Sequence, residues 1–270
     1  MAAKHSAGYS VKMRARRRWT IVLVISLVVL LGSLGALGAI AFSYWQGQQA
    51  YDRVDSLASL RDETNGIGID APDASFDLAA LTVDWAALSQ VNSDLVAWIY
   101  IPGTRVDYPV VRGADDEYYL DHDFERTQGA LTNNGCIFMK ASNSRDFSDR
   151  GTFLFGHNLN DGSMFAVLSD ESAFAGGRDI YVLTPHANMR LRPFALVHCS
   201  SDEPLAQTHF SSQADFGDYV ADKIGRSVVD VGASADPSSI DRFIALVTCD
   251  NLFTDGRYAL FCYVEEVAAR

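Results

Sequence analysis

Cys249 and Arg257 stand on either side of a short polar loop, one ending an apolar segment and the other opening the next. Residues 243–248 and 258–264 are both apolar and β-prone, which predicts two strands. Because the loop is short, we expect antiparallel neighbours whose ends lie side by side. A thiol attacks as the thiolate, and a nearby guanidinium stabilises that anion or the oxyanion of a tetrahedral intermediate. The pair therefore indicates nucleophilic thiol chemistry.

His157 is the candidate base for this thiol. It follows an expected strand over 152–155 and a glycine that permits tight backbone geometry. Cys249 also ends a strand, so two adjacent strand ends could bring thiol and imidazole within reach of each other. The rival pair, His198 and Cys199, are neighbours on one strand and should point to opposite faces. The remaining histidines show no partner in the sequence: His5 before the apolar segment, His122 at a surface or helix end, His186 in a turn and His209 before a helix.

Each of these features also has an ordinary structural interpretation. A cysteine at a strand end is commonly inert packing, a Gly-His-Asn sequence is commonly a turn, and an arginine is commonly a solvated surface charge. The acid run over 115–117 could attract a cation, but such runs are usually solvated faces, and we expect no metal site. No CxxC pair indicates zinc. We expect the other three cysteines to be buried small hydrophobes that form at most one disulfide: Cys136, Cys199 and Cys262.

Charge is unevenly distributed along the chain. The formal net charge is −12, and residues 1–18 carry six cations and no acid, so the rest of the chain carries −18. A body this acidic is a poor nucleic-acid binder. No charged residue occurs over 19–51, and residues 20–42 are long and apolar enough to cross a bilayer. With the cations on the cytoplasmic side, we expect a single-pass anchor with the C-terminal body outside. A cleaved signal peptide is the alternative, although its apolar region is usually shorter.

This pattern predicts four parts of the chain. They are a basic cytoplasmic segment (1–18), a transmembrane signal anchor (19–45), a stalk or linker (46–80) with helical character over 46–62, and an extracellular domain (81–270).

The sequence over 81–270 predicts several short strands with scattered helices, which favours a mainly β barrel or sandwich with helical insertions. Besides the two strands that flank the loop between Cys249 and Arg257 (called the thiol loop), strands are expected over 95–101, 105–111, 136–140, 152–155, 180–183 and 189–198. Helices are expected over 85–91 after the capping Asp84, over 113–122, from Asp161 to 168, and over 213–228.

The chain resembles the class B sortases, cysteine transpeptidases of Gram-positive cell surfaces. The resemblance runs from about residue 94 to residue 267, in segments that occur in the family's order. These are DLVAWIYIPGTRVDYPVV (94–111), EYYLDHDF (117–124), GTFLFGHNLNDGSMFAVL (151–168), THFSS (208–212) and LVTCDN…GRYAL (246–260). The resemblance implies an eight-stranded sortase-type β-barrel, with a long helix between the sixth and seventh strands near 213–228.

The resemblance also implies roles. Cys249 would attack the carbonyl of a threonine in a C-terminal sorting signal, His157 would act as general acid/base, and Arg257 would stabilise the oxyanion and hold substrate. A peptidoglycan precursor or a pilin lysine would supply the amine that resolves the thioester, and no cofactor is needed. Thr248, Val247 and Leu205 are expected in the substrate groove, where Val247 and Leu205 depart from the residues usual in the family.

Two other functions remain open from the sequence. One is a hydrolytic cysteine peptidase that uses the same three residues without amine transfer. The other is a non-catalytic surface barrel that binds haem or glycan.

Overall fold

The computed structural model describes residues 18–39, 41–42, 61–62, 77–128, 135–232, 236–249 and 256–270. The chain divides into two compact units, Met1–Gln46 and Gly47–Arg270. Most of the expected basic segment and of the expected stalk lies outside the described residues. Of the helix expected over 46–62 only the last two residues are described, and they form a short strand.

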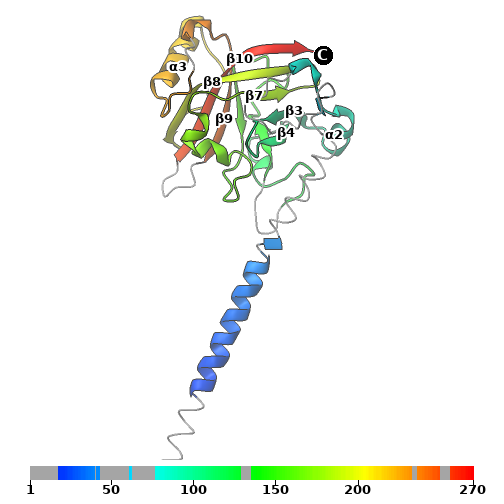
Figure 1. Cartoon of the computed structure of the whole chain (residues 1–270), viewed down its shortest axis with the longest axis vertical. Helices are drawn as coiled ribbons and strands as arrows, with labels where there is room; N and C mark the ends of the chain where they lie inside the picture. The colour runs from blue at the N-terminus through cyan, green and yellow to red at the C-terminus, as the bar shows by residue number, and fades with distance from the viewer. Residues whose placement is uncertain are drawn as a thin grey trace, which may run out of the picture. The chain divides into compact units, whose positions relative to one another are not determined.

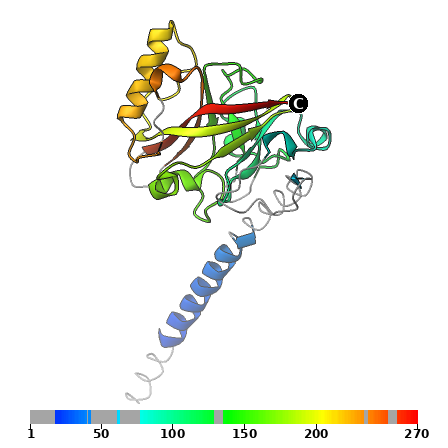
Figure 2. The ribbon, with the colours of Figure 1, turned by 45° about the horizontal axis from the view of Figure 1, so that its top comes forward.

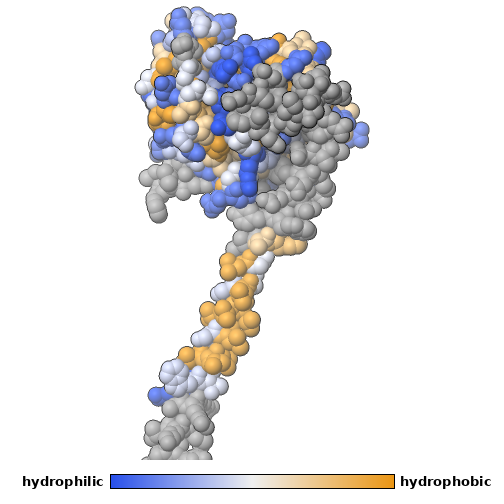
Figure 3. Space-filling view, viewed as in Figure 1, coloured by the Kyte–Doolittle hydropathy of each residue, from blue (hydrophilic) through white to orange (hydrophobic). Residues whose placement is uncertain are grey.

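The first unit contains one long apolar helix. Arg18–Ala39 comprises 22 residues, and its most apolar 18-residue stretch has a mean hydropathy of 2.6 and is not buried. Apolar side chains, in orange, make up much of its visible surface, with paler residues between them (Figure 3). Its length and composition suit a membrane span, and a helix of this kind near the N-terminus is consistent with the expected anchor.

The second unit is built on a closed barrel of eight strands (Figure 1). The order around the barrel is β10-β8-β7-β3-β4-β5-β6-β9. The strands are β3 (Leu95–Tyr100), β4 (Asp107–Val111), β5 (Ile137–Met139), β6 (Gly151–Phe155), β7 (Ile180–Leu183), β8 (Ala187–Ser200), β9 (Phe243–Cys249) and β10 (Gly256–Ala269). The mainly β, eight-stranded barrel expected from the sequence is confirmed.

Smaller elements surround the barrel. They are the strand pair β1 (Arg61–Asp62) and β2 (Leu81–Thr82), the α-helices α2 (Trp85–Val91) and α3 (Gln213–Gly225), and the 3-10 helices η1 (Leu78–Ala80), η2 (Tyr118–Leu120), η3 (Ala166–Ser169), η4 (Glu171–Phe174) and η5 (Pro237–Ser239). The expected helix between the sixth and seventh barrel strands is α3, which lies beside β8 (Figure 2).

Strand β9 shows how the sequence builds the barrel wall. Ile244 and Leu246 belong to the core cluster inside the barrel, whereas Ala245 and Val247 belong to a second cluster that includes the buried face of α3. Because both faces of the strand are covered, the sequence reads as a continuous apolar run rather than an alternating one. Only Cys249, at the end of the strand, is exposed.

Two expected helices are wrong. Over 113–122 only the 3-10 helix η2 forms, because the Asp115 carboxylate accepts from the backbone N–H groups of the next residues and closes a turn. Asp161 likewise accepts from the Ser163 N–H rather than starting a helix. Gly162 and Met164 have φ of 83° and 56°, a left-handed backbone that excludes an α-helix there. Only η3 forms near the end of that segment.

Candidate active site

Three strand ends meet at one rim of the barrel. β9 pairs in parallel with β6, with Phe155 opposite Val247, and antiparallel with β10, with Arg257 opposite Cys249. The Gly156 N–H donates to the Val247 carbonyl at 3.1 Å and continues the parallel ladder past the end of β6. The expected antiparallel arrangement around the thiol loop is confirmed, and the segment carrying His157 leaves β6 beside the end of β9.

A pocket of about 320 Å³ opens at this rim. Phe138, Phe155 and Val247 lie opposite one another across three adjacent strands and line its apolar part. The rings of Phe138 and Phe155 stack with their centroids 5.5 Å apart. The remaining lining residues are Asp116, Leu120, Lys140, Gly156, His157, Thr248, Cys249 and Arg257. The pocket therefore brings together the predicted thiol, imidazole and guanidinium.

Cys249 differs from the other cysteines in its exposure. All four are free, and the other three are buried, as expected. Burial raises the pKa of the Cys199 thiol, and complete burial raises the pKa of Cys262 well above its ordinary value. The Asn158 side-chain amide donates to the Cys249 carbonyl at 2.9 Å, which ties the thiol-bearing strand end to the segment after His157.

The His157 imidazole is half-buried, and its Nε2 lies 2.5 Å from the Leu120 carbonyl oxygen. A carbonyl oxygen only accepts, so Nε2 donates in this contact. Sequence reasoning missed Leu120 as part of the site, because a backbone carbonyl leaves no signature in residue types.

An ion pair at the pocket was also not predicted from the sequence. The Lys140 Nζ lies 2.6 Å from Asp116 Oδ2, and the Ala141 N–H donates to Asp116 Oδ1 at 2.6 Å. Asp116 belongs to the acid run that was expected to be a solvated face. Among the described residues no group of three or more histidine, cysteine or acidic side chains is placed to hold a metal ion.

The three residues expected in the substrate groove have different positions. Val247 and Thr248 line the pocket, although the Thr248 hydroxyl donates to the Gly156 carbonyl at 2.8 Å and so ties β9 to β6. Leu205 does not line the pocket: only 3% of it is exposed, and it packs in the cluster that includes the buried face of α3. Its carbonyl accepts from the Tyr219 hydroxyl. The position assigned to Leu205 needs correction, because its apolar side chain faces the core.

The alternative histidines lie outside the pocket. His198 stacks on Tyr258 at 4.3 Å, and His122 stacks on Tyr118 at 4.0 Å and contacts the Asp121 carboxylate. Neither lines the pocket that contains Cys249.

A closed eight-stranded barrel with an exposed thiol, an imidazole and a guanidinium in one rim pocket has the architecture of a sortase. No family model matches the chain. Sortase B from Listeria monocytogenes is 32% identical over 166 residues, which cover 60% of this chain. The match spans 65% of that relative's length, just under two thirds.

Solved structures give the same result. A Listeria monocytogenes sortase B is 30% identical with a TM-score of 0.57, and the match covers 66% of this chain and 98% of that one. A Staphylococcus aureus sortase B–substrate complex is 26% identical with a TM-score of 0.61, and the match covers 67% of this chain and 84% of that one. The chain belongs to the class B sortases.

Proposed function

We propose that this protein is a membrane-anchored cysteine transpeptidase that cleaves a C-terminal sorting signal after a threonine and transfers the protein to an amine. The observation that carries the proposal is the convergence of Cys249, His157 and Arg257 in one pocket, on three neighbouring chain segments. Membership of the class B sortases and the Staphylococcus aureus sortase B–substrate complex support it.

In the first half of the reaction, the Cys249 Sγ forms a bond to the threonine carbonyl carbon, and His157 takes the thiol proton. The carbonyl oxygen becomes an oxyanion, which the Arg257 guanidinium stabilises by charge and hydrogen bonding. Collapse of this intermediate breaks the peptide bond. The leaving amine takes a proton from His157, and a thioester remains on Cys249.

In the second half, an amine attacks the thioester carbonyl and transfers a proton to His157. The C–S bond breaks, the thiol is restored and a new amide bond joins the two substrates. The proposed acceptor is a peptidoglycan precursor or a pilin lysine, and the proposed donors are secreted proteins with sorting signals. The apolar helix Arg18–Ala39 would anchor the enzyme, with its N-terminus in the cytoplasm and the barrel outside.

Intact-protein mass spectrometry tests this proposal. The full chain in detergent micelles would be mixed with quenched fluorescent peptides of the x-Pro-x-Thr-x type, with and without an added amine. We expect a peptide adduct on Cys249 that amine resolves faster than water does, and no adduct on Cys249→Ala. An adduct that water resolves at the same rate with or without amine would indicate a hydrolytic peptidase and contradict the transferase proposal.

A further inference from the structure

The His157 ring is enclosed by backbone groups on the side of its Nε2 atom. The Leu120 carbonyl oxygen lies 2.5 Å from Nε2. A Cβ atom built on Gly135 would lie 2.7 Å from His157 Cδ2, 2.9 Å from Nε2 and 2.8 Å from the Leu120 oxygen. These separations are too short for any side chain at residue 135, and its φ of 55° also favours glycine. The Leu120 carbonyl and Gly135 together are called the imidazole seat below.

The seat has a chemical consequence for the imidazole. A neutral imidazole carries one proton, and the nitrogen that faces a carbonyl oxygen must be the donor. Nε2 therefore holds the proton of the neutral ring, and the lone pair is on Nδ1. We propose that the imidazole seat selects the Nε2–H tautomer of His157 and presents Nδ1 as the nitrogen that exchanges protons in the reaction. This rests on the proposed function insofar as His157 is the general acid/base.

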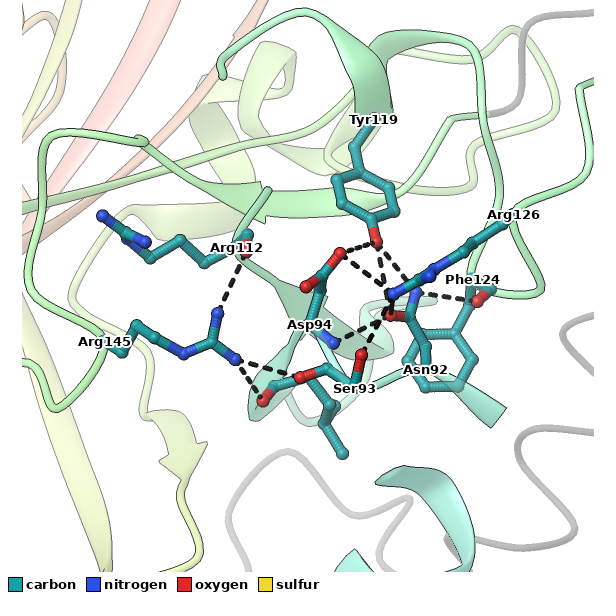
Figure 4. A network of polar contacts seen from close by, with 9 residues as sticks. Asn92, Ser93, Asp94, Arg112, Tyr119, Phe124, Arg126 and Arg145 are labelled. Atoms are coloured by element: carbon teal, nitrogen blue, oxygen red, sulfur yellow. Dashed lines mark hydrogen bonds and ion pairs between the residues drawn. The ribbon is translucent and has the colours of Figure 1, made fainter. Parts of the chain in front are cut away.

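A polar cluster around the buried side chains of Asn92 and Tyr119 lies next to the seat in the chain; Figure 4 shows the cluster. The Cys136 N–H donates to the Tyr119 carbonyl at 3.0 Å, which joins the chain on the two sides of the seat. The Tyr119 hydroxyl donates to Asp94 Oδ2 at 2.8 Å and accepts from the Asn92 amide at 3.0 Å. Burial is the largest of the effects that raise the pKa of Tyr119 to about 12, so its hydroxyl remains a donor at neutral pH. Tyr119 is thus a positioning residue that acts through its neighbour Leu120.

The charge in this cluster is compensated. Arg126 Nη2 lies 3.1 Å from Asp94 Oδ2 and also donates to the Asn92 side-chain oxygen at 3.0 Å. The Asn92 amide donates in addition to the Phe124 carbonyl at 3.0 Å. The segment over 119–126 is therefore attached to the residues before β3 at both of its ends. Because the Leu120 carbonyl lies in this segment, its position depends on the cluster.

Nitrogen NMR of the resting enzyme tests the tautomer without any substrate. The full chain in detergent micelles would carry 15N-labelled histidine, with the His157 signals assigned by their loss in His157→Gln. At a mildly alkaline pH, where ordinary histidine is neutral, we expect a pyrrole-like Nε2 and a pyridine-like Nδ1. The reverse assignment for His157 would overturn the proposal, whether or not a peptide substrate is known.

Gly135→Ala tests the seat itself. Its added methyl group should displace the ring, move the His157 signals away from the wild-type tautomer pattern, and lower kcat for peptide acylation by about 100-fold with KM nearly unchanged. The matched control is Gly177→Ala, at a glycine with φ of 90° whose Cβ would lie 2.9 Å from a backbone oxygen and which does not line the pocket. Wild-type tautomer signals together with a kcat equal to that of the control would overturn the proposal.

Tyr119→Phe provides a second test if Gly135→Ala does not fold. It should lower kcat by about tenfold and broaden or shift the His157 Nε2 signal. Tyr181→Phe is the control, because it removes another buried hydroxyl that faces a carboxylate, that of Asp179, away from the seat. Equal His157 spectra and equal kcat in the two variants would contradict a positioning role. If the wild-type enzyme shows a pyrrole-like Nε2 on His157 but acylates no peptide, the proposed function is contradicted and the seat remains supported.

Discussion

Arg257→Ala separates two roles that a guanidinium beside a thiol can have. One is to stabilise the thiolate of the free enzyme, and the other is to stabilise the oxyanion of the tetrahedral intermediate. Arg257 lies directly opposite Cys249 in the antiparallel register, which places their Cβ atoms about 5 Å apart. Because Cys249 is exposed, a thiolate and a guanidinium at this site would interact with an energy close to that in water, about 0.8 kcal/mol for two unit charges about 5 Å apart. Loss of that energy corresponds to a factor of about four in the rate of a reaction at the free thiol. Loss of an oxyanion donor costs more, about 3–4 kcal/mol, or about 100- to 1000-fold in rate.

The variant should therefore slow acylation by about 100-fold or more and slow alkylation of the free enzyme only about fourfold. Acylation is measured as adduct formation by intact-protein mass spectrometry under single-turnover conditions, and alkylation as the rate of iodoacetamide labelling. Arg190→Ala is the control, since that arginine pairs with Glu265 and Glu266 and does not line the pocket. Equal loss in the two assays would refute an oxyanion role, and an acylation rate within about threefold of wild type would refute both roles.

Three further predictions concern stability and the cysteines. Asn143→Ala should lower the free energy of unfolding in urea by about 3 kcal/mol, because this side chain is 1% exposed and bonds two backbone groups of β6 and a neighbouring carboxylate. Hydrogen bonds from Arg226 lower the pKa of Glu203 below its ordinary value of 4.5. The pair therefore stabilises the fold above pH 4.5, and this stabilisation is lost as the pH falls through the pKa that Glu203 has in the folded protein. Glu203→Gln should accordingly destabilise the protein at neutral pH, and urea titrations should show the difference from wild type vanishing in strong acid. In the native protein at neutral pH, iodoacetamide should add one label, at Cys249, since burial keeps the Cys262 thiol protonated; mass spectrometry showing prompt multiple labelling would contradict this.

Asp84 and Asp161 were both expected to begin a helix, and only the expectation at Asp84 was correct. Asp84, Asp115 and Asp161 each accept from a backbone N–H two or three residues ahead. After Asp84 the sequence continues with good helix formers, and α2 follows. After Asp161 comes Gly162 in a left-handed conformation, so the same side-chain interaction closes a turn. A capping residue in the sequence marks a chain reversal or a helix start, and the following residues decide between them.

In the site, too, relations between residues close in the sequence were predictable, and relations between distant residues were not. The relation of Cys249 to Arg257 follows from a short loop and was predictable from the sequence. The relation of His157 to Cys249 depends on the parallel pairing of β6 with β9, whose bridging hydrogen bond from Thr248 spans 92 residues. Residue types left this pairing open, and resemblance to a family supplied it. The imidazole seat was not predictable, because it consists of a carbonyl group and the absence of a side chain.

Different parts of the fold therefore control the position and the orientation of the proposed acid/base. The separation between the strand ends is set by the ladder of β6 and β9, which is buried on both faces. The orientation of the His157 ring is set by Leu120 and Gly135, at the edge of that ladder. Substitutions within β9 should consequently reduce stability and activity together. Substitutions at the seat should reduce activity with little change in the unfolding of the barrel, because the barrel core does not depend on which imidazole nitrogen carries the proton.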